Sequence, residues 1–181
     1  MDLVVVTLPA EAYASDDAAA RHDVGRARRA GWNGVGWQPP GGVAERRAYN
    51  IAAYRSERAF AHYMQCPEWE REKNGFRRPD VAGFSVRLAT GPRHGLVIHD
   101  RDCVAPYMLM RSTLDPLSFQ VVGAIRNREA VALRRRGVGR SLPGTTHAWV
   151  IPAGYLRMVY PPNSLEAAMR RDGFEPIPDP I

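Results

Sequence analysis

The chain has 181 residues, of which 45% are apolar, and it carries a formal net charge of +6 at pH 7. This composition indicates one folded domain with tails and excludes a disordered or fibrous protein, while the positive charge favours polyanion partners. No apolar run approaches the roughly 20 residues of a membrane span, and the short, acidic start of the chain argues against a secretory leader. Cys66 and Cys103 are far apart, as expected for idle thiols in a reducing compartment, so we expect a cytoplasmic protein without membrane contact.

We expect residues 1–42 to form an N-terminal unit of strand, basic helix and loop. Residues 3–9 are rich in β-branched side chains and end at a proline, which predicts a short strand or extended arm. A Ser-Asp-Asp run at 15–17 resembles a helix N-cap with an acidic first turn, so a helix is predicted over 18–30. Glycines, prolines and two tryptophans then predict a loop over 31–42.

We expect a core domain over residues 43–160, and a C-terminal helix with a proline-rich tail over 161–181. Apolar residues recur at helical spacing over 43–64, which predicts the longest helix. Alternating and β-branched runs then predict, in order, a strand–turn–strand over 79–87, strands over 96–99, 107–110 and 119–126, a helix over 127–136 capped by Asn127, a strand over 148–151 and a helix over 164–171. These elements predict an α/β (α+β) fold with a single mixed β-sheet of about five strands flanked by helices.

Glu57, Asp80, Ser85 and Arg87 form the first candidate site. Glu57 lies on the long predicted helix, and the strand pair is expected to bring Asp80 to the same side as Ser85 and Arg87. Two or three carboxylates can hold the divalent metal that phosphodiester hydrolysis needs, and a nearby cation can stabilise the charged transition state. The alternative is that Asp80 caps a turn and that Arg87 is a solvated strand residue.

His99, Asp100 and Asp102, with His94 upstream, form the second candidate site. A histidine with two carboxylates at this spacing can bind Zn²⁺ or Mn²⁺. An aspartate-rich segment that follows a strand can equally be a turn that caps its own backbone.

Arginines in several segments form the third candidate site. On one face of the protein they would bind nucleic acid in a salt-dependent way. The run of three at 134–136 ends a predicted helix, where the helix dipole alone favours cations. The residues predicted to bind nucleic acid are Arg28, Arg29, Arg46, Arg47, Arg77, Arg78, Arg134 and Arg135, with Arg26, Arg136 and Arg140 as further members of the basic set.

The first candidate site resembles a degenerate form of the PD-(D/E)xK nuclease superfamily. Pro79-Asp80 stands where that family has its Pro-Asp pair, and Ser85-Val86-Arg87 stands where it has the (D/E)xK tripeptide. Ser85 replaces a carboxylate that would bind metal, and Arg87 keeps the positive charge of the lysine but cannot share a proton at neutral pH. The resemblance implies a restriction-endonuclease-like core with Mg²⁺ held by Asp80 and Glu57, with Asp100 as a further ligand and Arg87 against the phosphate.

Residues 45–160 are also similar to a group of uncharacterised bacteriophage and prophage proteins. The stretches that carry the similarity are residues 79–87, 96–102, 107–110, 119–126 with Glu129-Ala130, and 148–152 with Leu156. Relatives usually have Gln-Val-Arg or a similar tripeptide in place of Ser85-Val86-Arg87. The resemblance implies a phage or prophage setting, and therefore the cytoplasm of a bacterial host.

The sequence thus predicts a phage-type nucleic-acid-binding protein, with DNA the favoured partner. Its nuclease-like core is either Mg²⁺-dependent or degenerate and inactive. The alternatives are a non-catalytic DNA-binding module and a phage structural or host-interaction protein.

Overall fold

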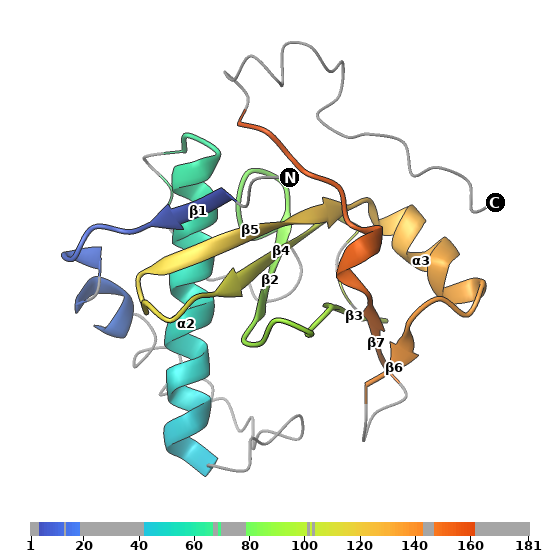
Figure 1. The fold of residues 1–181 in the computed structure, drawn as a ribbon, viewed down its shortest axis with the longest axis horizontal. Coiled ribbons are helices and arrows are strands. Elements are labelled where there is room, and N and C mark those ends of the chain that lie inside the picture. The colour runs from blue at the N-terminus through green and yellow to red at the C-terminus, as the bar shows by residue number, and fades with distance from the viewer. Residues whose placement is uncertain are drawn as a thin grey trace.

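The computed structural model describes residues 4–12, 14–18, 42–66, 69, 79–100, 102, 104–142 and 147–161 (Figure 1). Residues 31–41 of the loop predicted over 31–42 and the terminal helix predicted over 164–171 lie outside these residues, as does the predicted basic helix beyond residue 18. The proposed division of the chain after residues 42 and 160 stays a prediction.

The described strands form two sheets. The first has the order β1-β5-β4-β2, in which β2 and β4 are parallel and the other pairs are antiparallel. The second has the order β3-β7-β6, with both pairs antiparallel. The strands of the first sheet are β1 (Val4–Thr7), β2 (Ser85–Ala89), β4 (Tyr107–Ser112) and β5 (Ser118–Ile125), and those of the second are β3 (Leu96–His99), β6 (Arg140–Ser141) and β7 (Ala148–Ile151).

The mixed α+β class is therefore confirmed, but the prediction of one sheet of about five strands is wrong. The predicted strand over 96–99 pairs with the one over 148–151 and not with the central strands, with Leu96 opposite Ile151. Period-two alternation identifies a strand and its buried face but not its partner, because pairing depends on contacts between distant parts of the chain.

The long helix α2 (Gly42–Tyr63) lies across one face of the four-stranded sheet (Figure 1). Its apolar side chains Ala59 and Phe60 are fully buried and belong to one core with Val86, Met108 and Phe119. This helix confirms the prediction over 43–64, and its packing fixes the helix over β2, which carries the candidate site.

A second core lies beside α3 (Asn127–Arg135), at the other end of the molecule (Figure 1). Leu133 of α3 is buried there with Leu96 and Ile151 of the second sheet, and with Tyr107 and Ile125 of the first. This core joins the two sheets, and the 3₁₀ turn η2 (Ala153–Tyr155) follows β7 next to it.

Two local predictions differ from the structure. The helix over 127–136 is confirmed, but Arg126 is its cap and Asn127 its first residue; the backbone N–H of Arg126 donates to Glu129 Oε2 at 3.1 Å. The run 15–17 does not precede a helix, because residues 14–18 are already helical. Within that turn Asp16 and Asp17 form ion pairs with Arg58 and Arg55 of α2.

Candidate functional site

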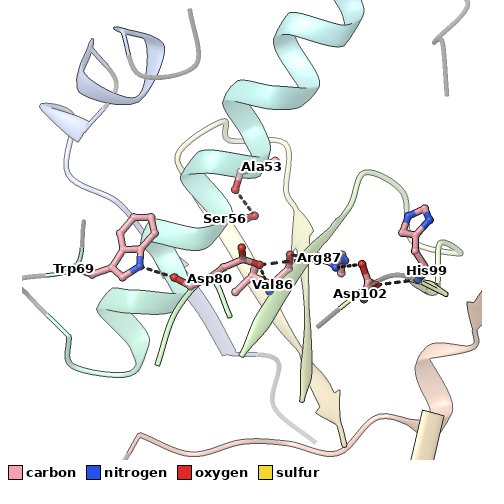
Figure 2. Close-up of polar contacts among 8 residues, drawn as sticks. All are labelled: Ala53, Ser56, Trp69, Asp80, Val86, Arg87, His99 and Asp102. Atoms are coloured by element: carbon pink, nitrogen blue, oxygen red, sulfur yellow. Dashed lines mark hydrogen bonds and ion pairs between the residues drawn. The ribbon is translucent and has the colours of Figure 1, made fainter. Parts of the chain in front are cut away.

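Asp80 is held in place by a tight turn at the start of β2. Ala82 and Gly83 both have positive φ, at 47° and 83°, which is the backbone of a type I′ turn. The predicted first strand of this pair is reduced to one bridge between Val81 and Phe84. The turn folds back so that Asp80 Oδ2 accepts the N–H of Val86 at 2.8 Å (Figure 2).

Trp69 fixes the backbone of the same residue. Its indole N–H donates to the carbonyl oxygen of Asp80 at 2.8 Å (Figure 2). The Arg58 guanidinium lies 5.8 Å from the centre of the indole ring, and Arg58 Nε donates to Asp16 at 2.8 Å. A chain of polar contacts therefore links the N-terminal segment through α2 to Asp80.

Arg87 lies between two carboxylates. Its Nη2 is 2.9 Å from Asp102 Oδ1, and its Nη1 is 3.6 Å from Asp80 Oδ2 (Figure 2). The guanidinium also lies 5.7 Å from the ring centre of Tyr107, which is within cation–π range. Burial would lower the pKa of Arg87, but the charges of Asp102 and Asp80 outweigh burial and raise the pKa above its usual value. The sequence prediction that Asp80 and Arg87 share a site is met by this geometry.

Asp102 is the second acid of this site, and its side chain is only 4% exposed. Its Oδ2 accepts the N–H of His99 at 2.8 Å, so it closes the turn that follows β3. The phenol oxygen of Tyr107 accepts a hydrogen bond from Asn127 Nδ2 at 3.2 Å, and the charge of Asp102 acts on the same phenol. Burial and then the charge of Asp102 raise the pKa of Tyr107 to about 12. We call Asp80, Arg87, Asp102 and Tyr107 the Arg87 site.

Glu57 and Ser85 are both buried. Glu57 is 5% exposed on α2, the helix that packs over β2, and Ser85 is 2% exposed opposite Tyr107 in the parallel pair of β2 and β4. Ser85 is therefore enclosed within the sheet. The roles predicted for these two residues stay predictions.

Asp100 belongs to a different contact from Asp102, although only one residue separates them. It forms an ion pair with Arg134 of α3, and its Oδ2 lies 3.6 Å from His147 Nδ1. The hydrogen bond from Arg134 lowers the pKa of Asp100 below its usual value. Arg134 in turn lies 5.7 Å from the ring centre of Trp149. His99 is exposed at the end of β3. The segment from His99 to Asp102 is therefore a turn whose two aspartates form ion pairs with Arg134 and Arg87.

The carboxylates of this region do not fit a resident Mg²⁺ as they are arranged. No group of three or more His, Cys, Asp or Glu side chains suited to a metal occurs among the described residues. Mg²⁺ needs several oxygens at 2.0–2.1 Å in near-octahedral geometry. Oxygens of Asp80, Asp100 and Asp102 face arginines instead, so a metal would have to displace a guanidinium first. Mg²⁺ binding at Asp80, Glu57 and Asp100 stays a prediction.

The predicted nucleic-acid-binding arginines fall into three groups. Arg28, Arg29, Arg77 and Arg78 lie outside the described residues. Arg46 is half-buried and Arg47 exposed near the start of α2. At the end of α3, Arg134 is engaged with Asp100 and Trp149, whereas Arg135 is exposed.

Two features of this region were not predicted from the sequence. Asp102 was considered as a metal ligand or turn residue, and its contact with Arg87 was missed because it joins residues 15 apart through two strands that do not pair with each other. The arginines of α2 that bind Asp16 and Asp17 were also missed. Their three-residue spacing, at 55 and 58, places both on one helix face and was the available signal.

Comparisons with protein-family models, with curated proteins and with solved structures find no match for this chain. Within the part of the chain that the structure describes, no helix is long and apolar enough to cross a membrane.

Proposed function

We propose that this chain is a DNA-binding protein of the phage or prophage type, with a restriction-endonuclease-like core whose nuclease-like centre is not catalytic. The observation that carries the proposal is the position of Arg87 between Asp80 and Asp102. A guanidinium shared by two carboxylates forms an ion-paired unit that joins the turn before β2, β2 itself and the turn after β3. Such a unit differs from a nuclease centre, where the carboxylates face a metal and its water.

The residue types at the site support the same conclusion. Ser85 cannot supply the negative charge of the carboxylate that it replaces, and Arg87 stays protonated at neutral pH. Asp102, the second acid beside Arg87, accepts hydrogen bonds from a backbone N–H and from a guanidinium. These contacts engage one carboxylate oxygen each, Oδ1 with Arg87 and Oδ2 with the N–H of His99.

DNA binding is supported by the positive net charge of the chain and by the pairing of several of its acidic side chains with arginines within the fold. The formal net charge is +6, and almost all basic residues are arginines, which suit bidentate contacts to phosphate. Several acids pair with arginines inside the described structure, whereas Arg47, Arg135, Arg136 and Arg140 are exposed there. The phage or prophage setting and the bacterial cytoplasm rest on the resemblance of the motifs in residues 45–160 alone, because the comparisons with known proteins find no match.

A second candidate is a Mg²⁺-dependent phosphodiesterase with the same core. One observation favours it: Asp80 and Arg87 lie on the same side of the turn, with 3.6 Å between Arg87 Nη1 and Asp80 Oδ2. In this candidate Asp80 and Glu57 would hold the metal, and Arg87 would offset charge on the phosphate.

Two assays on the full chain separate these candidates. In a gel-shift series from about 50 to about 300 mM NaCl, we expect the logarithm of the affinity for a DNA duplex to fall linearly with that of the salt concentration. With Mg²⁺ we expect no strand cleavage. Cleavage that disappears in Asp80→Asn and persists in Asp115→Asn, an exposed control, would establish the phosphodiesterase. Absence of binding, or affinity that does not change with salt, would overturn DNA binding.

A further inference from the structure

Three arginines between α3 and β7 are exposed and carry uncompensated charge. Arg135 ends α3, Arg136 follows it, and Arg140 begins β6. Among the described residues, none of the three forms an ion pair, whereas their neighbour Arg134 pairs with Asp100. We call Arg135, Arg136 and Arg140 the arginine turn.

The backbone that carries these side chains is fixed. Gly137 and Gly139 have φ of 75° and 92°, and the N–H of Val138 donates to Leu133 O at 3.0 Å, which ends α3. Trp149 Nε1 donates to the carbonyl of Val138 at 2.7 Å from β7. Arg140 then pairs with Val150 in the second sheet. The arginines therefore project from a backbone that is ordered before any ligand binds, which lowers the entropic cost of binding.

The arginine turn is connected to the Arg87 site by two short links. Asp100 and Asp102, in one turn after β3, pair with Arg134 and Arg87 respectively. At its other end α3 begins with Asn127, which bonds to Tyr107 of the Arg87 site. The nine-residue helix α3 is roughly 13 Å long, at 1.5 Å per residue. Measured along the axis of a DNA duplex, this length spans about four phosphates of one strand.

We propose that the arginine turn is a surface that binds the phosphate backbone of DNA. This proposal rests on the proposed function and names where the DNA lies: against the end of α3 and the start of β6, where the three arginines are exposed. Arg134 is excluded from the contact because Asp100 and Trp149 hold it. The three arginines supply positive charge and hydrogen-bond donors without base recognition, so the binding they provide is independent of sequence.

The test compares single substitutions that each remove one positive charge. R135Q, R136Q and R140Q are each measured against a duplex of about 20 base pairs over the same salt series, and R93Q, an exposed arginine between β2 and β3, is the matched control. The slope of log affinity against log salt is negative. For each single variant of the turn we expect its magnitude to decrease by roughly 0.9, and for the triple variant by about 3. R93Q should leave the slope unchanged.

The outcomes separate this proposal from the proposed function. If the wild type binds with a clear salt slope and the triple variant keeps that slope, the arginine turn is not the contact, although DNA binding stands. If the wild type shows no salt-dependent binding, both fail. Should the triple variant not fold, amide chemical shifts of the labelled wild type with the same duplex decide the question. We expect shifts at residues 135–141, and their absence during saturable binding would overturn the proposal.

Discussion

Asp102 approaches Arg87 more closely than Asp80 does, although only Asp80 belongs to the nuclease-like pattern. The two distances to the guanidinium are 2.9 Å and 3.6 Å, and the Asp102 side chain is 4% exposed against 23% for Asp80. A less solvated and closer carboxylate interacts more strongly with the same cation. Asp102 is therefore the main partner of Arg87, and it also fixes the turn after β3 through His99.

Asp102→Asn tests this assignment through stability. The substitution keeps the shape of the side chain but removes its charge, so Arg87 and the N–H of His99 lose a charged acceptor. We expect the free energy of unfolding to fall by about 1.5–3 kcal/mol, the range for hydrogen bonds to charged groups, as measured by urea denaturation.

Asp80→Asn serves as the comparison, because it weakens the longer and more exposed of the two contacts. We expect a smaller loss of stability than in Asp102→Asn. The assignment of Asp102 as the main partner is wrong if the order of the two effects is reversed.

At the scale of elements, the end of α3 depends on two glycines that have different surroundings. Both Gly137 and Gly139 have positive φ, but a Cβ at Gly137 would meet nothing within 4 Å. A Cβ on Gly139 would collide with the backbone carbonyl of Val150 and with the indole nitrogen of Trp149. Gly139 is therefore needed for both its conformation and the close approach of β7.

Alanine substitutions distinguish these two requirements. We expect Gly137→Ala to destabilise the protein by about 1–2 kcal/mol, the cost of left-handed backbone for a residue with a Cβ. Gly139→Ala carries the same backbone cost, and its Cβ also pushes the turn away from β7. In urea denaturation its loss of stability should therefore be clearly larger than that of Gly137→Ala. Equal losses would mean that the contact with Val150 does not constrain the turn.

The elements also show what the sequence could and could not predict. The strands over 96–99 and 148–151 and the helices α2 and α3 follow from periodic apolar residues, and their observed bounds match the predictions closely. The pairing of β3 with β7 and the use of Arg126 as the cap of α3 were not predictable in this way. Pairing is decided by a core that joins Leu96, Leu133 and Ile151, and the cap by a reach-back contact from Glu129. The pair of Asp80 and Arg87 was predictable because one turn brings them together.

At the scale of the whole molecule, acids and arginines pair across elements that are distant in the sequence. Asp16 and Asp17 attach the N-terminal segment to α2. Asp102 joins the turn after β3 to β2, and Asp100 joins the same turn to α3. Glu129 of α3 pairs with Arg157, which follows η2. Each pair closes a long loop of chain. Since the carboxylates in these contacts titrate, the stability of the whole fold depends on pH.

Asp100 and Asp16 should affect acid stability in opposite directions. Arg134 lowers the pKa of Asp100 below 3.8, so its contribution to stability is complete above that pH and is lost as the pH falls through its pKa in the folded state. Burial raises the pKa of Asp16 above 3.8, since its side chain is 1% exposed and its Oδ2 has no hydrogen-bond partner among the described residues. Its contribution is therefore complete below pH 3.8 and is lost as the pH rises through its raised pKa.

Urea denaturation of the wild type, D100N and D16N between about pH 6 and about pH 3 measures these effects. The wild type should lose stability on acidification, because its 19 acidic residues become neutral while its 25 lysines and arginines stay charged and repel one another. We expect a smaller loss in D100N, in which one acid-sensitive contact is already absent. We expect a larger loss in D16N, which lacks an acid whose protonation favours folding. If D16N and D100N change the pH dependence in the same direction, Asp16 is not desolvated by its contact with α2, and the N-terminal segment is not fixed there as described.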